Sequence, residues 1–401
     1  MPSYKNSDTR LPIMEGSPPA LVPPKMDWDR APWNRWSFQH VREVLPTAEV
    51  WRGAGPARIF PRNEVDLDAV AVTDSTGVAT TLAGVLDDTY TDAIMVLKNG
   101  AVAYERYFNG MTPRTLHLSQ SVAKSFVGMV AGILVGRGVL NVDALVTTYL
   151  PELEQTGWRG ATLQQVLDMT TGTRFEENYT NPYSDIGQMD VACDWKPVPP
   201  DSDPAFKWPR HIWELILGLS GVDRPHGELF AYRSVETDVL AFCMERVTGK
   251  RLPQLLSEEL WQKMGAEESA CFTVDSAGYA LASGGLNASL GDYARFGQLI
   301  LEGGGGIIPP HWIEATRTGN HGIFKEPYSY SFPQGAYKNQ FWIEDSTSRA
   351  IMCRGVFGQM IYVNWDSNMV VAKLSSWPDF LSIPFNITTL NAVHAIAGAL
   401  K

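Results

Sequence analysis

The chain has 401 residues, of which 44% are hydrophobic, and its formal net charge at pH 7 is −11. This length predicts two to three domains or one large two-lobed unit, and the 13 Trp and 16 Phe residues supply enough apolar surface for a core. The negative charge argues against nucleic acid or an anionic membrane as a partner.

Residues 1–60 are rich in Pro and Trp and predict an irregular N-terminal extension that wraps the body of the protein. Residues 1–35 contain no apolar stretch long enough for a secretion signal, and no segment reaches ~18 continuous apolar residues, so neither a leader nor a membrane span is expected. The four cysteines form no Cys-x-x-Cys pair and predict buried free thiols in a cytoplasmic protein, with metal or redox use as the alternative: Cys193, Cys243, Cys271 and Cys353.

A β-hairpin is the first regular element that the sequence predicts. Two β-rich runs, 93–97 and 101–107, flank an Asn-Gly pair at Asn99-Gly100, which is a strong hairpin signal. An apolar run with helical spacing follows Ser121 and extends to about Val135, where Gly136-Arg137-Gly138 ends it.

The only Ser-x-x-Lys of the chain, Ser121 to Lys124, stands at the start of this helix. The spacing of one turn places both side chains on the same face. A serine hydroxyl becomes a good nucleophile when a neighbour takes its proton, and a lysine can do so if its pKa is lowered. The alternative is an ordinary helix start with a Ser cap.

His117 is a second candidate base, although a structural or pocket-lining role is the simpler interpretation.

Residues 140–280 are predicted to be mostly helical, with helices over 162–169 and 233–246. Between these helices, residues 174–206 lack periodicity and predict a long loop, which in a compact domain is usually functional or disordered. Residues 176–203 contain seven acids against one base, Lys196. This excess would favour a substrate with a protonated amine, and a solvated loop is the alternative.

The last part of the chain predicts a helix, a β-meander and a final helix. Ser289 with Asp292 forms a start like a capping box for a helix over 289–301. Strand-like runs follow at 341–343, 360–364 and 369–374, and a helix covers about 387–400. We therefore predict an α+β fold, in which both chain ends build an antiparallel sheet around an inserted helical lobe. The predicted parts are an extension (1–60), an α/β domain (61–135 and 281–401) and a helical domain (136–280) with a substrate loop (174–206).

Several segments resemble, in the right order, the serine β-lactamase and penicillin-binding superfamily in its class C-like branch. They are Ser121-x-x-Lys124, 138–152, 162–172, Tyr232-Arg233-Ser234, 283–286, 292–297 and 355–359, the last in place of Lys-Thr-Gly. Within this superfamily, the Tyr-x-Ser element, the Gly-x-x-Gly-Gln strand and the ending 373–378 resemble the 6-aminohexanoate-oligomer hydrolases. The resemblance implies a β-lactamase-like fold in which helices flank the antiparallel sheet, and a reaction that needs no metal or cofactor.

The resemblance also implies catalytic roles. Ser121 would be the nucleophile and Lys124 its base, with Tyr232 as the third member. The neighbouring ammonium would lower the pKa of the Tyr232 phenol, which would then relay a proton to the leaving group. A packed aromatic with a satisfied hydroxyl is the alternative for Tyr232. The oxyanion hole would consist of the backbone N–H groups of Ser121 and Val356.

Four further residues are expected at the substrate. In the nylon-oligomer hydrolases a Tyr and an Asp close on the substrate, and by spacing Tyr179 and Asp190 are the matching residues. Ser234 would bind Lys124 or the substrate, and a buried structural hydroxyl is almost as good an interpretation. Phe357 stands near the position of the Lys-Thr-Gly lysine and cannot hold the carboxylate of a β-lactam antibiotic, which argues against β-lactamase or peptidoglycan activity.

We therefore predict a serine hydrolase that cleaves small amides through an acyl-enzyme on Ser121. A carboxylesterase is the first alternative, and a non-catalytic acyl-binding module is the second. The chain has no Gly-x-Ser-x-Gly elbow, no His-Glu-x-x-His and no phosphate loop after 303–306, so other chemistries are not favoured. The expected partner is a small amide or ester. Members of the resembling family are often dimers, so the resemblance makes a homodimer a further expectation.

Overall fold

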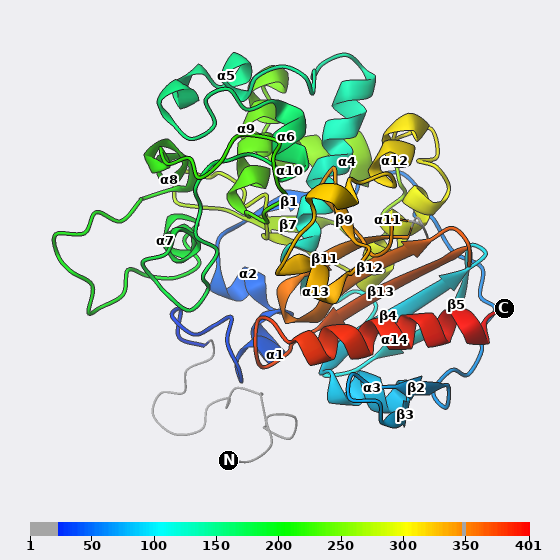
Figure 1. Ribbon diagram of the computed structural model, residues 1–401. Coiled ribbons are helices and arrows are strands. Elements are labelled where there is room, and N and C mark those ends of the chain that lie inside the picture. The colour runs from blue at the N-terminus through cyan, green and yellow to red at the C-terminus, as the bar shows by residue number, and fades with distance from the viewer. Residues whose placement is uncertain (1–22, 347–349) are drawn as a thin grey trace.

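The computed structural model describes residues 23–346 and 350–401 (Figure 1). Its α-helices are α1 Asn34–Ser37, α2 Val41–Val44, α3 Leu82–Asp88, α4 Val122–Gly136, α5 Val146–Tyr149, α6 Leu163–Leu167, α7 Asp185–Ala192, α8 Ile212–Gly218, α9 Val235–Thr248, α10 Leu252–Leu256, α11 Leu290–Leu301, α12 Pro310–Thr316, α13 Tyr328–Ser331 and α14 Ile383–Ala399. Short 3-10 or π turns are η2 Pro151–Gln155, η3 Ser257–Trp261, η4 His321–Ile323 and η5 Val356–Gly358.

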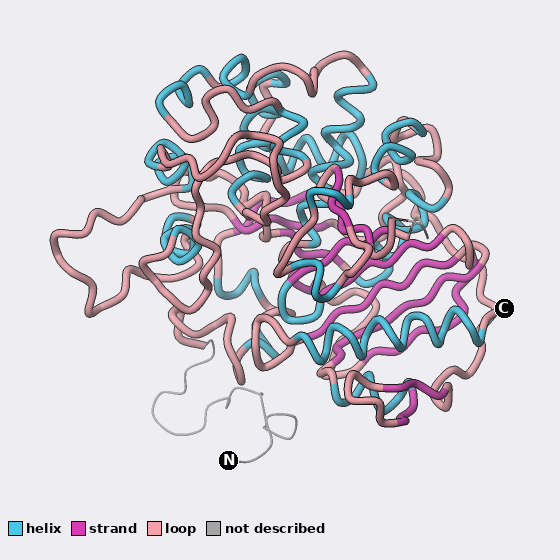
Figure 2. Tube along the Cα trace, in the orientation of Figure 1, coloured by secondary structure: helices cyan, strands magenta, loops and turns pink. Residues whose placement is uncertain are grey.

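A large antiparallel sheet of seven strands has the order β5-β4-β13-β12-β11-β10-β9. Its strands are drawn in magenta in Figure 2. Its strands are β4 Thr91–Lys98, β5 Ala101–Tyr107, β9 Ala336–Lys338, β10 Phe341–Ile343, β11 Ile351–Gly355, β12 Gln359–Asn364 and β13 Met369–Ser375. The predicted hairpin is β4–β5, and it pairs with β13 near the end of the chain. The predicted sheet built from both chain ends is thereby confirmed.

Both faces of this sheet are buried because successive side chains of its strands point to opposite sides. On β4, Ala93, Met95 and Leu97 pack in one core, whereas Ile94 and Val96 pack in the other. The first core lies against α4 and α11, and α14 lies along the opposite face (Figure 1). Strands covered on both faces read as nearly continuous apolar runs, which is why these segments could be recognised in the sequence.

The helix α4 passes through the middle of the apolar core and is buried from Val122 to Leu134. Two of its glycines permit this close packing. A Cβ at Gly128 would lie 2.5 Å from the carbonyl oxygen of Asn339, and one at Gly132 would lie 2.3 Å from the ring of Trp312. The small residues therefore allow the helix that begins after Ser121 to lie directly against neighbouring chain segments.

A smaller four-stranded sheet, β1-β7-β8-β6, lies under the helical lobe. Its strands are β1 Thr47–Val50, β6 His117–Leu118, β7 Ala270–Thr273 and β8 Leu286–Ala288. The strand β6 leads directly into the turn before Ser121. A two-stranded ribbon, β2 Ala71–Thr73 with β3 Ala79–Thr81, packs beside α14.

Two segments that were expected to be irregular contain short regular elements. Residues 1–60 were expected to be irregular, but within the described part α1, α2 and β1 are regular, and β1 pairs with β7; residues 1–22 lie outside the described residues. The long loop 174–206 contains the helix α7. The side chain of Ser184 accepts a hydrogen bond from Gly187 N–H and thus caps α7, a local signal that the acidic composition obscured. The division into domains remains a prediction.

The four cysteines are free and buried, and none of the described helices is long and apolar enough to cross a membrane. The N-terminal segment packs on the body as expected. Trp28 is completely buried, its ring packs edge-on against Trp195 at 5.2 Å, and its indole N–H donates to the Trp195 carbonyl at 2.9 Å. This segment is therefore anchored at the side of the molecule where the acidic loop lies.

We expect Trp28→Ala to lower the free energy of unfolding by about 3–5 kcal/mol, because it removes a fully buried aromatic side chain. Trp51→Ala is the matched control, since the Trp51 side chain is 52% exposed and its loss should cost less than about 0.5 kcal/mol. Urea denaturation followed by circular dichroism measures both. Equal transition midpoints for the two variants would contradict a firmly anchored N-terminal segment.

Candidate active site

Ser121 lies at the junction between the small sheet and α4. It is the N-cap residue of α4, and the preceding Gln120 has a left-handed backbone with φ of 50°. Such a conformation is unfavourable for a residue other than glycine and persists where the surrounding structure enforces it, as at tight turns and functional sites. The sharp turn connects β6 to α4 and leaves the Ser121 side chain at a cavity.

Lys124 lies one turn along α4, and its ammonium is enclosed by oxygen atoms. Nζ donates to Ser121 Oγ at 2.9 Å, to Ser234 Oγ at 3.2 Å and to the carbonyl oxygen of Ser283 at 2.6 Å. Burial lowers the pKa of Lys124 to about 8, although the carboxylates of Glu177 and Asp238 act in the opposite direction. Ser121 and Lys124 are therefore in contact, as their spacing predicts. The Ser234 hydroxyl contacts Lys124, which was one of the roles expected for it.

A second layer of acids holds this arrangement. Glu177 accepts two hydrogen bonds from Ser234, one from the hydroxyl at 2.5 Å and one from the backbone N–H at 3.0 Å. Asp238 accepts a hydrogen bond from Ala282 N–H at 2.8 Å and so orders the loop that carries the Ser283 carbonyl. Burial raises the pKa of Asp238 to about 7.

Tyr232 lies against both members of the Ser121–Lys124 pair. The Lys124 ammonium is 5.1 Å from the centroid of the Tyr232 ring, and Tyr232 lines the same cavity as Ser121. The expected lowering of its pKa was wrong. Burial raises the pKa of Tyr232 and the Glu177 carboxylate adds to this effect, so the phenol is neutral at rest.

The end of β11 closes the site from the other side. A Cβ on Gly355 would lie 2.5 Å from the carbonyl oxygen of Ser119 and 3.0 Å from the Ser121 nitrogen, so this strand touches the turn of the nucleophile. Gln359 secures the η5 turn, because its side-chain amide bonds both the N–H (3.1 Å) and the carbonyl (2.6 Å) of Ser375 on β13. The strand end at 355–359 therefore lies directly beside Ser121, although it lacks the Lys-Thr-Gly sequence.

Two cavities meet at this site and share Tyr179, Val356 and Phe380 as lining residues. We call the one of about 370 Å³, which contains Ser121, Tyr232, Glu177 and Arg354, the Arg354 cavity. The one of about 400 Å³, which contains Asp29, Asp190, Lys196 and Phe357, is the Asp190 cavity. Tyr179 stands between them, and its hydroxyl donates to Glu177 Oε1 at 2.7 Å.

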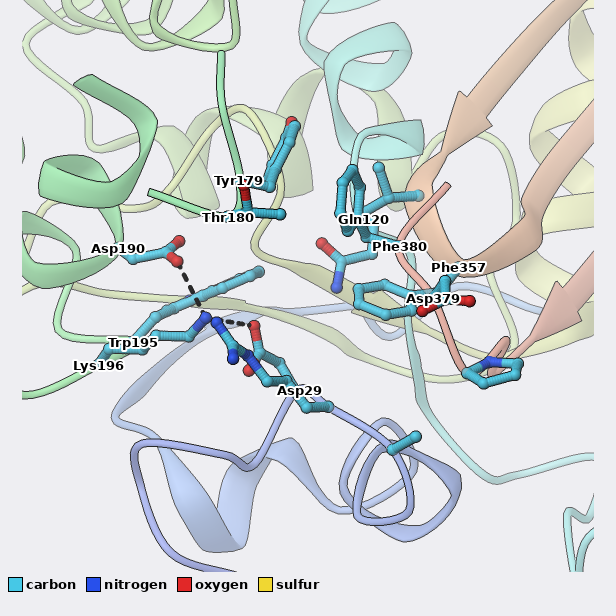
Figure 3. Close-up of a pocket in the computed structure, with 14 residues that line it drawn as sticks. Asp29, Gln120, Tyr179, Thr180, Asp190, Trp195, Lys196, Phe357, Asp379 and Phe380 are labelled. Atoms are coloured by element: carbon cyan, nitrogen blue, oxygen red, sulfur yellow. Dashed lines mark ion pairs between the residues drawn. The ribbon is translucent and has the colours of Figure 1, made fainter. Parts of the chain in front are cut away.

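Lys196 lies between two carboxylates in the Asp190 cavity (Figure 3). Its ammonium is 3.1 Å from Asp190 Oδ2 and 3.0 Å from Asp29 Oδ2. Burial raises the pKa of Asp190, while Lys196 acts against this rise. Asp190 therefore lies in a cavity beside Tyr179 as expected, but it is already paired with Lys196, the single base of residues 176–203.

His117 is buried in a different network. Its Nε2 is 3.1 Å from Asp92 Oδ2 and its Nδ1 is 2.9 Å from the Leu118 carbonyl oxygen, which is the structural role that was the simpler interpretation. Sequence reasoning missed Glu177, Asp29 and Arg354. Glu177 was counted only as one acid of the loop, and its place two residues before Tyr179 was the available signal.

Comparison with known proteins agrees with this geometry. The family described as Beta-lactamase matches residues 79–382. A 6-aminohexanoate-dimer hydrolase from Paenarthrobacter ureafaciens is 35% identical over 377 residues, which cover 91% of this chain and 92% of the relative.

Two solved structures extend the comparison. One from Bacillus anthracis, with the provisional name 6-aminohexanoate-dimer hydrolase, is 31% identical with a TM-score of 0.85, and the match covers 94% of this chain and 96% of the other. A family VIII carboxylesterase is 15% identical with a TM-score of 0.57 over 80% of this chain and 95% of the other, and it shares the fold alone.

We expect Gly355→Ala to slow labelling of Ser121 by a fluorophosphonate by about tenfold or more, because the added methyl group forces the strand away from the nucleophile turn. Gly398→Ala is the control, since a Cβ there meets no atom within 4 Å. Labelling rates and melting temperatures would be compared for both. Unchanged labelling in Gly355→Ala would show that the contact does not shape the site.

Proposed function

The chain belongs to the β-lactamase family of serine hydrolases, and on this basis we propose that it cleaves short linear amides of the 6-aminohexanoate type through an acyl-enzyme on Ser121. The observation that carries the proposal is the contact of the buried Lys124 ammonium with Ser121 Oγ at 2.9 Å. The 6-aminohexanoate-dimer hydrolase that shares 35% identity supports the choice of substrate class.

In the proposed acylation, neutral Lys124 takes the proton of Ser121 as Oγ attacks the amide carbonyl. The pKa of about 8 makes a neutral lysine accessible near physiological pH, which an exposed lysine would not allow. The backbone N–H groups of Ser121 and Val356 would bind the oxyanion, a role supported by the contact of Gly355 with the nucleophile turn.

Collapse of the tetrahedral intermediate requires a proton on the leaving nitrogen. The neutral Tyr232 phenol lines the cavity beside Ser121, and its ring lies against the Lys124 ammonium, so it can pass a proton from the lysine to the leaving group. Because its pKa is raised, this role is a relay in which the phenol gives one proton and receives another, and no resting phenolate is needed. Water then attacks the acyl-enzyme with Lys124 again as base.

The Asp190 cavity is the proposed site for the protonated amine end of the substrate. Two acids, Asp29 and Asp190, share Lys196. With Arg30 and Asp379 included, the cavity is lined by three acids and two bases and so keeps one net negative charge. Asp29 Oδ1 is buried and has no hydrogen-bond partner among the described residues, and it is therefore an open acceptor for an ammonium group. Tyr179 stands at the border of the cavity, where it would close on the substrate.

Turnover of matched amide and ester substrates tests the proposal. We expect the purified protein to hydrolyse the 6-aminohexanoate dimer and Ser121→Ala to lose this activity by at least about 1000-fold, as expected for a nucleophile. p-Nitrophenyl butyrate and a chromogenic cephalosporin are the comparison substrates. Ester hydrolysis without amide hydrolysis would replace the amidase by the carboxylesterase alternative. Fluorophosphonate labelling of Ser121 without turnover of any of these substrates would show that the nucleophile is reactive and that the substrate belongs to another class.

The pH dependence of Ser121 labelling should follow Lys124. Labelling requires neutral lysine, so its rate is expected to be low below the pKa, to rise through about pH 8 and to level off above it. Glu177→Gln removes a carboxylate that raises the pKa of Lys124, and the midpoint should therefore move to lower pH. The glutamine oxygen can still accept from the Ser234 hydroxyl, as Glu177 Oε1 does, whereas the amide nitrogen that replaces Oε2 cannot accept from the Ser234 N–H. A midpoint that stays in place or rises would contradict the assignment of Lys124 as base.

A further inference from the structure

Arg354, the penultimate residue of β11, places a guanidinium beside the aromatic rings that line part of the Arg354 cavity. The group stacks on two aromatic rings, with Cζ 4.7 Å from the centroid of Phe332 and 5.7 Å from that of Trp342. Its Nη2 donates to Asn386 Oδ1 at 2.5 Å. These contacts fix the plane of the guanidinium at the wall of the cavity that also contains Ser121.

No carboxylate among the described residues forms an ion pair with Arg354. Glu344 acts on it electrostatically, but this carboxylate is engaged by His394 Nε2 at 2.9 Å and by the Tyr362 hydroxyl at 2.7 Å. Glu177, the acid that lines the same cavity, is held by Ser234 and Tyr179.

The other arginines of the helical lobe and the sheet edges are mostly paired with acids, as in Arg174–Asp223 and Arg62–Glu105. A guanidinium has five N–H donors, and the structure records one acceptor for them at Arg354. Burial lowers the pKa of Arg354 to about 10, so the group still carries its charge at neutral pH. A charge in such surroundings is unfavourable without a partner, which indicates a ligand.

We propose that Arg354, together with Asn386, binds a carboxylate at the far end of the leaving half of the substrate. This inference rests on the proposed amidase function and specifies its substrate class. The planar fork of arginine binds both oxygens of a carboxylate, and the Asn386 side chain has amide N–H donors beside it. An apolar cavity with one cation at its wall fits an alkyl chain that ends in an anion.

The two cavities then recognise opposite ends of one molecule. In a 6-aminohexanoate dimer the carboxylate belongs to the half that leaves with the amide nitrogen, and the ammonium belongs to the acyl half. The Arg354 cavity would therefore hold the leaving half, and the Asp190 cavity, with its excess of negative charge, would hold the acyl half. A substrate with a neutral far end would lose one of these two anchors.

The first experiment compares the 6-aminohexanoate dimer with its carboxamide, which differs only in the charge of the far end. We expect kcat/KM of the wild-type protein to be about 10- to 100-fold higher for the carboxylate. Arg354→Gln should reduce this ratio to near one, mainly through a higher KM for the carboxylate. Arg106→Gln is the matched control, because Arg106 also stacks on an aromatic ring, that of Tyr104 at 4.4 Å, but lines neither cavity.

A second variant separates binding from a structural role. Asn386→Asp keeps the arginine and places a carboxylate beside it, which should occupy the guanidinium and lower the preference for the carboxylate substrate to a similar degree. Melting temperatures check that both variants are folded. A merely structural Arg354 would reduce turnover of both substrates equally, and an unchanged ratio in Arg354→Gln would overturn the proposal while the amidase function stands.

A competition assay decides the question even if neither amide is cleaved. Hexanoate and hexanamide would be tested for their ability to slow fluorophosphonate labelling of Ser121. We expect hexanoate to protect at about tenfold lower concentration in the wild-type protein and to lose this advantage in Arg354→Gln. Equal protection by the two compounds in the wild-type protein, or a difference that persists in the variant, would refute the carboxylate anchor independently of the amidase proposal.

Discussion

The burial of the Lys124 ammonium is the constraint on which the rest of the site depends. A lysine on a helix that runs through the core cannot keep its charge without oxygen partners, and the chain supplies Ser121, Ser234 and the Ser283 carbonyl from separate segments. Burial lowers its pKa, whereas nearby acids limit that decrease. This balance, rather than the presence of a lysine, makes a proton exchange with Ser121 feasible near neutral pH.

Close packing of the backbone brings the partners of Lys124 into place. Glycines in α4 let the helix contact neighbouring segments, and Gly355 lets β11 touch the turn that carries Ser121. The Gln359 side chain then ties that strand end to β13. A strand with Lys-Thr-Gly would place a cation at this edge. In this chain Phe357 makes that edge apolar, and the cation that lines the cavity is the Arg354 guanidinium.

Charge is distributed unevenly over the two cavities. The Asp190 cavity contains a lysine shared by two acids, one of which, Asp29, comes from the anchored N-terminal segment (Figure 3). The Arg354 cavity contains a guanidinium without an acid partner among the described residues. The proposed nucleophile lies near the border of the two, beside Tyr179 and Val356. Such a division favours a flexible chain with unlike ends over a compact neutral ester.

The sequence by itself determined the local elements and the spacing of Ser121 and Lys124, because hairpin turns, helical periodicity and one-turn spacing are short-range properties. It also indicated Tyr232 and the family. Only the tertiary structure decided which distant groups surround them. Glu177, Asp29 and Arg354 have no distinctive local pattern, and the pairing of Lys196 with Asp29 joins segments far apart in the chain. The upward shift of the Tyr232 pKa likewise depends on burial and on Glu177, which the neighbouring residues in the sequence do not specify.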